Sequence, residues 1–511
     1  MKKKSLFLTS AAFLLSLGCL TGCNLNANTI TVWVGKESVA YYTQAAEKFV
    51  SENPDFTMKI KINEADTGSA AGEMLKDNTS CADILTVAHD NIGKLSQLSY
   101  IAPIVDKDLL KQIDEDNPDS FKDVIKNILG DGEADPTKYT FGVPYISQAL
   151  FLYYDTRYVT DEEAETFEGL VQAAKRYDTK YGVSGTKGWT VTGDDGFNFS
   201  YSLLSRHLND DGTHYSSLHL FDDHDTKKCY VQSNDQVAVM RWLQRMYAND
   251  NGFLFNNGST WALNMQNHKC LSIIGGAWHY DAFKTTVTDG DKIYMGCKRI
   301  PTFELMPEDV QGIDAITYPN STGVPEELRG TVDPAPQAGT KFRGGSFVDC
   351  KCFVINMAAM GTDERVEKYY NMCKLIKYFS SKEVQKGSFK EALNVPAYEG
   401  SEEYIESIKN EIDPTAYLMA TAQTGMASYG ISQPFVDASL NTRYYSKGTP
   451  DLYKNCMIKR EGVGVTVEGI RELLWQMEYI WKWGANADTK KSAYPKSFPA
   501  ASDTKCHGSA E

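Results

Sequence analysis

Apolar runs of strand length alternate with helical patterns at the start of the chain, and this alternation limits the possible folds more than any other feature. Residues 30–34 form a near-continuous apolar run with β-branched side chains, and residues 39–50 repeat apolar side chains at three- and four-residue steps until Asn53-Pro54. Two more strand-like runs, at 58–62 and 82–87, enclose a weaker helical segment. The pattern predicts an α/β fold with a parallel sheet covered by helices.

The first 22 residues have the composition of an export signal. Three lysines at positions 2–4 precede an apolar run over residues 6–17, which is too short to span a bilayer comfortably. The following Leu20-Thr21-Gly22-Cys23 resembles the bacterial lipoprotein box, in which the cysteine receives lipid, including palmitate. We therefore expect a signal peptide at 1–22, lipidation of Cys23 and a spacer over 23–29. This resemblance implies a protein tethered through Cys23 to the extracellular face of the cell membrane, or a periplasmic one in a Gram-negative cell.

The charge balance limits the partners. The 511 residues are 42% apolar, which allows two or three domains or one large two-lobed unit. The formal net charge is −15, and without the three signal lysines 49 basic residues stand against 67 acidic ones. This balance argues against binding to nucleic acid. We expect a monomer, and the 12% aromatic content suits stacking against a flat ligand.

Nine cysteines follow Cys23, an odd number without a repeating spacing, so at least one is unpaired within the chain. Cys350-Lys351-Cys352 has a spacing shorter than that of a zinc knuckle, and it lies in an apolar alternating run. We interpret these cysteines as small core residues. Neither a metal site nor a cofactor is expected.

Strand and helix patterns continue through the rest of the chain. Runs at 141–145 and 149–154 predict strands, whereas the proline- and glycine-rich stretch at 301–345 predicts a long surface insertion. Helical periodicity returns at 366–379 and again at 466–481, where Thr466 is a candidate N-cap. The segment 485–511, rich in Ala, Ser, Lys and Pro, is expected to be a disordered tail.

Six short blocks occur in one order along the chain: residues 30–37, Ala82-Asp83-Ile84-Leu85 with Ala88-His89-Asp90, Phe141-Gly142-Val143-Pro144 before residues 149–155, Ile274-Gly275-Gly276-Ala277-Trp278, Ile300-Pro301, and Thr466-Val467-Glu468. Together they resemble the extracellular sugar-binding lipoproteins of ABC importers, the family that includes maltose-binding protein. The resemblance implies a two-lobed, periplasmic-binding-protein-like α/β fold with a hinge and a ligand cleft between the lobes. It places lobe 1 at 30–146 and 300–395, with a loop-rich insertion at 304–343, and lobe 2 at 147–299 and 396–484.

The resemblance also implies candidate ligand residues. Sugars present hydroxyls and apolar C–H faces, so a sugar cleft needs aromatic rings and planar polar side chains. Trp278 matches the family's ring-stacking position, and Asp90 could accept hydroxyls or cap the following helix. Just upstream, where maltose-binding protein has a stacking tryptophan, this chain has Val87. The other candidates are Lys36, Glu37, Gln148, Phe197 with Phe199 as its near equivalent, Tyr280, Gly345, Tyr429 and Phe435.

By this resemblance the chain is a binding protein and not an enzyme. It would capture a carbohydrate, specifically an oligosaccharide, and deliver it to ABC transporter permease subunits when the lobes close. One alternative is a non-sugar ligand such as a polyamine, a metal chelate or a polyol phosphate. Another is a lipid-anchored glycoside hydrolase, which needs two opposed carboxylates. The acidic pairs Asp194-Asp195 and Asp210-Asp211 are adjacent in sequence, which is more typical of solvated turns.

Overall fold

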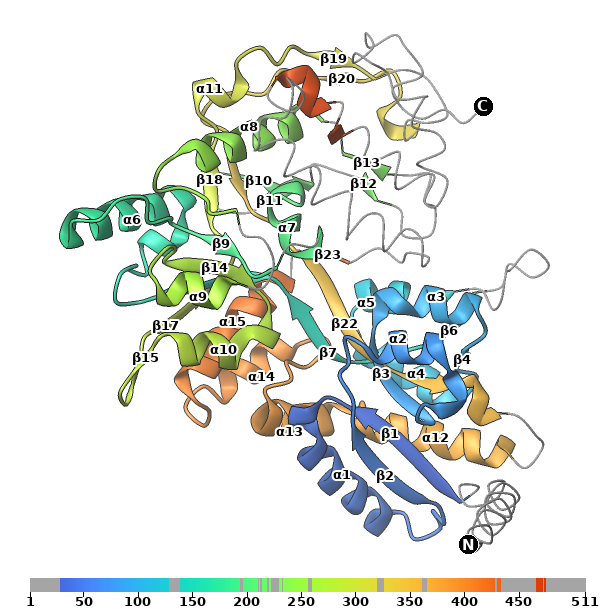
Figure 1. Ribbon diagram of the computed structural model, residues 1–511. Coiled ribbons are helices and arrows are strands. Elements are labelled where there is room, and N and C mark those ends of the chain that lie inside the picture. The colour runs from blue at the N-terminus through green and yellow to red at the C-terminus, as the bar shows by residue number, and fades with distance from the viewer. Residues whose placement is uncertain are drawn as a thin grey trace, which may run out of the picture.

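The computed structural model describes residues 28–127, 138–193, 196–209, 211, 214–217, 220–221, 229–231, 233–255, 260–318, 326–360, 365–427, 430–432, 466–471 and 473–474. These residues form two lobes joined by long strands (Figure 1). The predicted signal peptide, Cys23 and the tail at 485–511 lie outside the described residues.

The first lobe is built on a seven-stranded sheet. Strand β1 (Thr29–Val34) pairs in parallel with β2 (Lys59–Glu64) and with β3 (Ile84–Ala88). Helices α1 (Val39–Glu52) and α2 (Ala70–Lys76) connect these strands in sequence. The parallel, helix-connected start that the periodicity predicted is thereby confirmed, and α1 ends directly before the asparagine-proline pair.

Two long antiparallel strands extend this sheet toward the second lobe (Figure 1). Strand β7 (Val143–Ala149) pairs with β22 (Phe347–Asn356), and β22 also pairs with β3. Phe347 lies in the core of the second lobe, while the apolar side chains of β22 from Val348 onward lie in the core of the first. The strand therefore carries the chain from one lobe to the other.

The second lobe contains two four-stranded sheets. In one, β8 (Phe151–Asp155) lies between β14 (Ser272–Gly275) and β17 (Met295–Lys298), both antiparallel to it, and β9 (Thr190–Val191) pairs in parallel with β14. The other sheet has the order β11–β10–β21–β18; its strands are β10 (Arg206–Leu208), β11 (His214–Ser217), β18 (Thr302–Glu304) and β21 (Lys341–Arg343).

Further elements belong to each lobe, and one of them, β4 (Ile101–Ala102), pairs with β22 in the seven-stranded sheet. On the first-lobe side they are α3 (Ile92–Gln97), α4 (Lys107–Asp116), α5 (Asp119–Val124), α12 (Arg365–Phe379), α13 (Lys382–Ala392), η1 (Lys36–Ser38), η3 (His89–Asn91), β4 (Ile101–Ala102), β5 (Lys126–Asn127) and β6 (Tyr139–Thr140). On the second-lobe side they are α6 (Phe167–Tyr181), α7 (Gly196–Leu203), α8 (Asn234–Ala248), α9 (Trp261–Gln266), α10 (Tyr280–Thr286), α11 (Pro307–Val310), α14 (Ser401–Ser407), α15 (Pro414–Ala427) and η5 (Ala277–His279).

The boundary between the lobes differs from the expected one. Ile300, Phe303, Leu305 and Phe342 are all buried in the core of the second lobe, and β21 pairs with β10 and β18 there. The chain therefore returns to the first lobe at about Val348 and not at residue 300. The stretch expected to be a loop-rich insertion contributes strands and core residues to the second lobe. Its strands are too short to produce a readable period, which is why the sequence indicated only loop.

Two smaller sequence predictions are confirmed within the described residues. The Gly469 N–H donates to Thr466 Oγ1 at 3.0 Å, so Thr466 is the N-cap of the last helix, whose residues beyond 474 are not described. Cys350 and Cys352 are fully buried core residues with sulfur atoms 3.6 Å apart.

No cluster of His, Cys, Asp or Glu able to hold a metal ion occurs in the part of the chain that the structure describes.

Among the residues that the structure describes, no helix has the length and apolar character needed to cross a bilayer.

Candidate functional site

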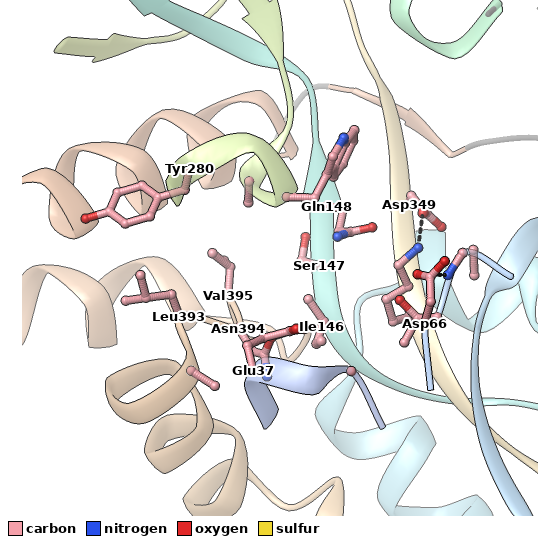
Figure 2. Close-up of a pocket in the computed structure, with 18 of the residues that line it drawn as sticks. Glu37, Asp66, Ile146, Ser147, Gln148, Tyr280, Asp349, Leu393, Asn394 and Val395 are labelled. Atoms are coloured by element: carbon pink, nitrogen blue, oxygen red, sulfur yellow. Dashed lines mark hydrogen bonds and ion pairs between the residues drawn. The ribbon is translucent and has the colours of Figure 1, made fainter. Parts of the chain in front are cut away.

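A cavity of about 760 Å³ opens between the two lobes (Figure 2). Its first-lobe wall comes from η1, the segment after β2, and η3, while α7, η5 and α10 form the second-lobe wall. Strands β7 and β22 and residues 392–395 contribute the rest of the lining. The cavity thus lies beyond the carboxyl ends of β1, β2 and β3, where an open parallel sheet is expected to bind ligands.

Seven of the ten residues expected to contact a ligand line this cavity: Lys36, Glu37, Asp90, Gln148, Phe197, Trp278 and Tyr280. The structure brings them together from segments almost 250 residues apart in sequence. Phe199, the near equivalent of Phe197, is fully buried in the second core. Tyr429 and Phe435 lie outside the described residues.

Gly345 does not line the cavity. Its N–H donates to the Tyr201 carbonyl at 2.8 Å, and a Cβ at this position would lie 1.8 Å from the Leu204 carbonyl oxygen. The position requires glycine because two backbone segments meet there. Gly345, a candidate ligand residue from the sequence, therefore packs against residues at the end of α7 and does not face the cavity.

Trp278 forms an apolar shelf on the second-lobe wall. It follows β14 on the short helix η5, and it remains 45% exposed. Its indole folds back over Gly276, where a Cβ would come within 2.1 Å of the ring. Below the turn, the Tyr153 hydroxyl donates to the Gly276 carbonyl at 3.1 Å, and the Phe197 ring centre lies 5.8 Å from that of Trp278. The glycine turn therefore holds a flat aromatic surface in the open cavity.

Tyr280 has a mainly structural position. Only 5% of the residue is exposed, and its hydroxyl lies 2.6 Å from Thr415 Oγ1 at the start of α15. Lys284 Nζ lies 5.3 Å from the ring centre. Burial raises the pKa of the Tyr280 hydroxyl. The residue ties α10 to α15, and Figure 2 shows it on the opposite side of the cavity from Asp66 and Asp349.

Asp349 and Lys351 face the cavity from β22, with His89 packed behind them. His89 Nδ1 lies 2.6 Å from Asp349 Oδ1, and Lys351 Nζ lies 3.7 Å from Asp349 Oδ2. Burial opposes protonation of His89, but its hydrogen bond with Asp349 raises the pKa of the imidazole well above its ordinary value. Despite burial, Lys351 and His89 hold the pKa of the Asp349 carboxyl below its ordinary value. The three side chains form a buried ionic group near neutral pH.

The segment after α13 closes the floor of the cavity. Asn394 Nδ2 donates to Ser38 Oγ and to Ser388 Oγ, each at 2.8 Å. The Ser147 N–H donates to the Val395 carbonyl at 2.8 Å, and Gln423 Nε2 donates to the Ser147 carbonyl at 2.5 Å. These bonds fix the position of β7 between η1 and α15, so Gln148 has a defined place at the base of the cavity.

Several lining residues were not identified from the sequence. Glu64 is the last residue of β2, and Asp66 and Thr67 follow it, so the rule that places ligand residues at the carboxyl ends of β1 and β3 would have found them. Asp349 and Lys351 were visible as charges in an otherwise apolar run. Asn198 and Asp281 had no comparable signal, because each comes from a helix whose cavity-facing side depends on packing.

The fold and the interlobe cavity define a two-lobed binding protein. A family model described as bacterial extracellular solute-binding protein matches residues 44–415, and the chain belongs to this family. It is therefore a member of a family of solute-binding proteins and not of enzymes. No curated protein sequence matches the chain.

Solved structures of similar fold span nearly the whole molecule. The maltose-binding periplasmic protein MalE from Listeria monocytogenes, in complex with maltose, is 16% identical with a TM-score of 0.59, and the match covers 92% of this chain and 99% of that one. MalX from Streptococcus pneumoniae, in complex with maltopentaose, is 17% identical with a TM-score of 0.56 and coverage of 87% and 99%. The maltodextrin binding protein MalE1 from L. casei BL23 is 15% identical with a TM-score of 0.55 and coverage of 91% and 97%. At these identities the likeness shows the fold, and the predicted two-lobed architecture is confirmed.

Proposed function

We propose that this protein captures a carbohydrate, specifically an oligosaccharide, in the interlobe cavity. It then delivers this ligand to the permease subunits of an ABC transporter. The observation that carries the proposal is the composition of the cavity. An exposed indole and the neighbouring Phe197 ring form one wall, carboxylate side chains stand on the other side, and the amide of Gln148 lies at the base. Rings can cover the apolar face of a sugar while carboxylates and amides bind its hydroxyls.

Two further observations support a carbohydrate. The MalE and MalX structures of the same fold were solved with maltose and maltopentaose. The volume of about 760 Å³ is in the range of cavities that hold ligands larger than a single sugar unit.

We propose further that Cys23 carries the lipid that tethers the protein outside the cell. A tether would keep the loaded protein near the membrane in which its permease resides. The test is to express the full chain and a Cys23→Ala variant with a radiolabelled fatty acid. We expect label only in the unchanged chain, and label on both would exclude Cys23 as the lipid site.

The carbohydrate proposal is tested by titrating protein that begins at residue 24 with oligosaccharides of different length and linkage. Calorimetry and tryptophan fluorescence report binding, and fluorescence should respond because Trp278 lies in the cavity. We expect at least one oligosaccharide to bind with one-to-one stoichiometry. Binding of an amine or a peptide with no response to any sugar would overturn the proposal.

A further inference from the structure

The cavity is much more acidic than the chain as a whole. The sequence contains 67 acidic and 52 basic residues, a mild excess. The cavity lining contains six carboxylates and two lysines: Glu37, Glu64, Asp66, Asp90, Asp281 and Asp349 against Lys36 and Lys351. The acidic bias is therefore a local property of this site and does not follow from the overall charge.

One of the six carboxylates already has its charge compensated inside the protein. Asp349 is enclosed between His89 and Lys351, so Lys351 is not available to the other five. Asp66 accepts the Gly68 N–H at 3.0 Å, and this donor is neutral. Lys36 is then the one remaining lysine among the described lining residues.

Three of the carboxylates have no ion-pair partner among the residues that the structure describes. Over the described ranges of the chain, Glu37, Glu64 and Asp281 form no ion pair with a basic side chain. Each of the three is exposed to solvent in this structure. In the open cavity, water and dissolved ions can screen these charges.

Closure of the lobes around a ligand would remove that screening. Like charges repel more strongly as water is excluded, because the local dielectric constant falls. A neutral sugar can donate hydroxyl hydrogen bonds to carboxylates, but it brings no positive charge. A ligand with a protonated amine would offset the excess negative charge and bind the carboxylates through charge-assisted hydrogen bonds.

The two walls of the cavity also differ in composition, and together they suit an ammonium group. Glu37, Glu64, Asp66 and Asp90 come from the first lobe, whereas Phe197 and Trp278 come from the second. A cation between the walls would meet carboxylates on one side and the face of an exposed indole on the other. Tryptophan is the aromatic side chain that attracts cations most strongly.

Building on the function proposed above, we propose that the ligand is a carbohydrate with protonated amino groups, such as a short oligomer of 2-amino sugars. The sugar rings would cover the Trp278 shelf, and the ammonium groups would face Glu64, Asp66 and their acidic neighbours. This assignment concerns the charge of the ligand and leaves the length of the oligomer open.

The experiment compares three trisaccharides of the same linkage: glucosamine, N-acetylglucosamine and glucose trimers. Only the first carries positive charge. Calorimetry at a pH below the pKa of the sugar amine should show at least about tenfold tighter binding of the glucosamine trimer. Its affinity should fall with added salt and as the pH rises through the pKa of the amine. The two neutral trimers should show little dependence on either condition.

Charge-neutral variants test the carboxylates. Glu64→Gln and Asp66→Asn preserve shape while removing charge, and each should weaken binding of the glucosamine trimer severalfold without weakening that of neutral trimers. Glu47→Gln, on the exposed face of α1 outside the cavity, is the matched control and should change neither affinity.

The outcomes separate this inference from the proposed function. If the neutral trimers bind as tightly as the glucosamine trimer, or tighter, the ligand is not a positively charged sugar. The proposed carbohydrate binding would still stand. Spermidine is included as a cation without sugar rings. Tight binding of spermidine with no binding of any saccharide would overturn both.

Discussion

Trp278 shows how a few neighbouring residues keep a large aromatic side chain exposed. The indole rests over Gly276, and Tyr153 holds the carbonyl of that glycine from the core side. An exposed tryptophan gains little stability for the folded protein, since much of its apolar surface stays in water. Its contribution is expected in the complex, when a ligand covers the ring.

Replacing Trp278 with alanine should therefore weaken ligand binding while the free energy of unfolding stays nearly unchanged. We expect a loss of about 2 kcal/mol, or about thirtyfold in Kd, because the ring is a central anchor. Calorimetric titration with the tightest oligosaccharide measures the loss. Tyr370→Ala, which removes a 44% exposed ring on the first lobe away from the cavity, is the control. Equal affinity in the unchanged protein and in Trp278→Ala would remove this residue from the binding site.

The His89 and Asp349 pair should make stability depend on pH. The pKa of His89 is raised in the folded state, so its protonated form stabilises the fold fully below the unfolded value of about 6.5 and loses this effect as pH rises through the raised pKa. The pKa of Asp349 is lowered, so its contribution is lost only in acid, as pH falls through that lowered value. The pair is thus most effective between these limits.

We therefore expect His89→Gln to cost about 3 kcal/mol of unfolding free energy near pH 6, with the cost shrinking as the pH rises through the raised pKa. Urea unfolding of both proteins across this pH range measures the difference. A cost that is independent of pH would mean that His89 acts by packing alone. Lys122→Gln, which removes a surface ion pair with Asp119, should cost little at any pH and controls for general charge effects.

At the scale of elements, the sequence predicts longer elements better than very short ones. Helices α1, α2 and α12 and the first three strands lie nearly where the sequence predicts them, because each spans enough residues to show a helical repeat or an apolar strand-length run. The strands β18, β20 (Val332–Asp333) and β21 have two or three residues each, and the sequence of their region is rich in proline and glycine. Their formation depends on partners distant in sequence, such as β10, which local patterns do not reveal.

The same difference between longer and very short elements explains which site residues the sequence could locate. Residues that follow long predicted strands, such as Lys36, Glu37 and Asp90, could be located from periodicity and the family resemblance. Gly345 was a candidate ligand residue, but it packs against Leu204, which is 141 positions away in sequence, and a local pattern does not reveal such a contact.

The structural role of Gly345 leads to a prediction about the start of β22. Gly345→Ala should lower the free energy of unfolding by about 2 kcal/mol, since the new Cβ cannot fit beside the Leu204 carbonyl without backbone movement. The affinity of the folded protein for its ligand should be unchanged. Gly72→Ala is the opposite control: its Cβ would meet nothing within 4 Å on α2, and alanine should stabilise by about 0.5 kcal/mol. If Gly345→Ala weakened ligand binding and left the free energy of unfolding unchanged, Gly345 would have to be counted as a ligand contact.

At the scale of the whole molecule, three crossings between the lobes lie side by side. The Leu150 N–H, just after β7, donates to Ser346 Oγ, just before β22, at 2.8 Å. The third crossing, at residues 395–397, is bound to the first, since the Ser147 N–H donates to the Val395 carbonyl and Ile146 forms a bridge with Pro396. Connections tied together in this way favour rotation of the lobes about one hinge over independent movement.

A single hinge at the base of the cavity predicts that the molecule contracts when ligand binds. The apolar shelf of Trp278 is on one lobe and most carboxylates of the cavity are on the other, so a ligand makes all of its contacts only when the two walls approach each other. We expect solution X-ray scattering to show a smaller radius of gyration at saturating oligosaccharide than in the free protein. The Trp278→Ala variant without ligand should match the free unchanged protein, which controls for effects of the substitution itself. Binding that saturates in calorimetry without any contraction would contradict hinge closure and would place the ligand on one wall of an open cavity.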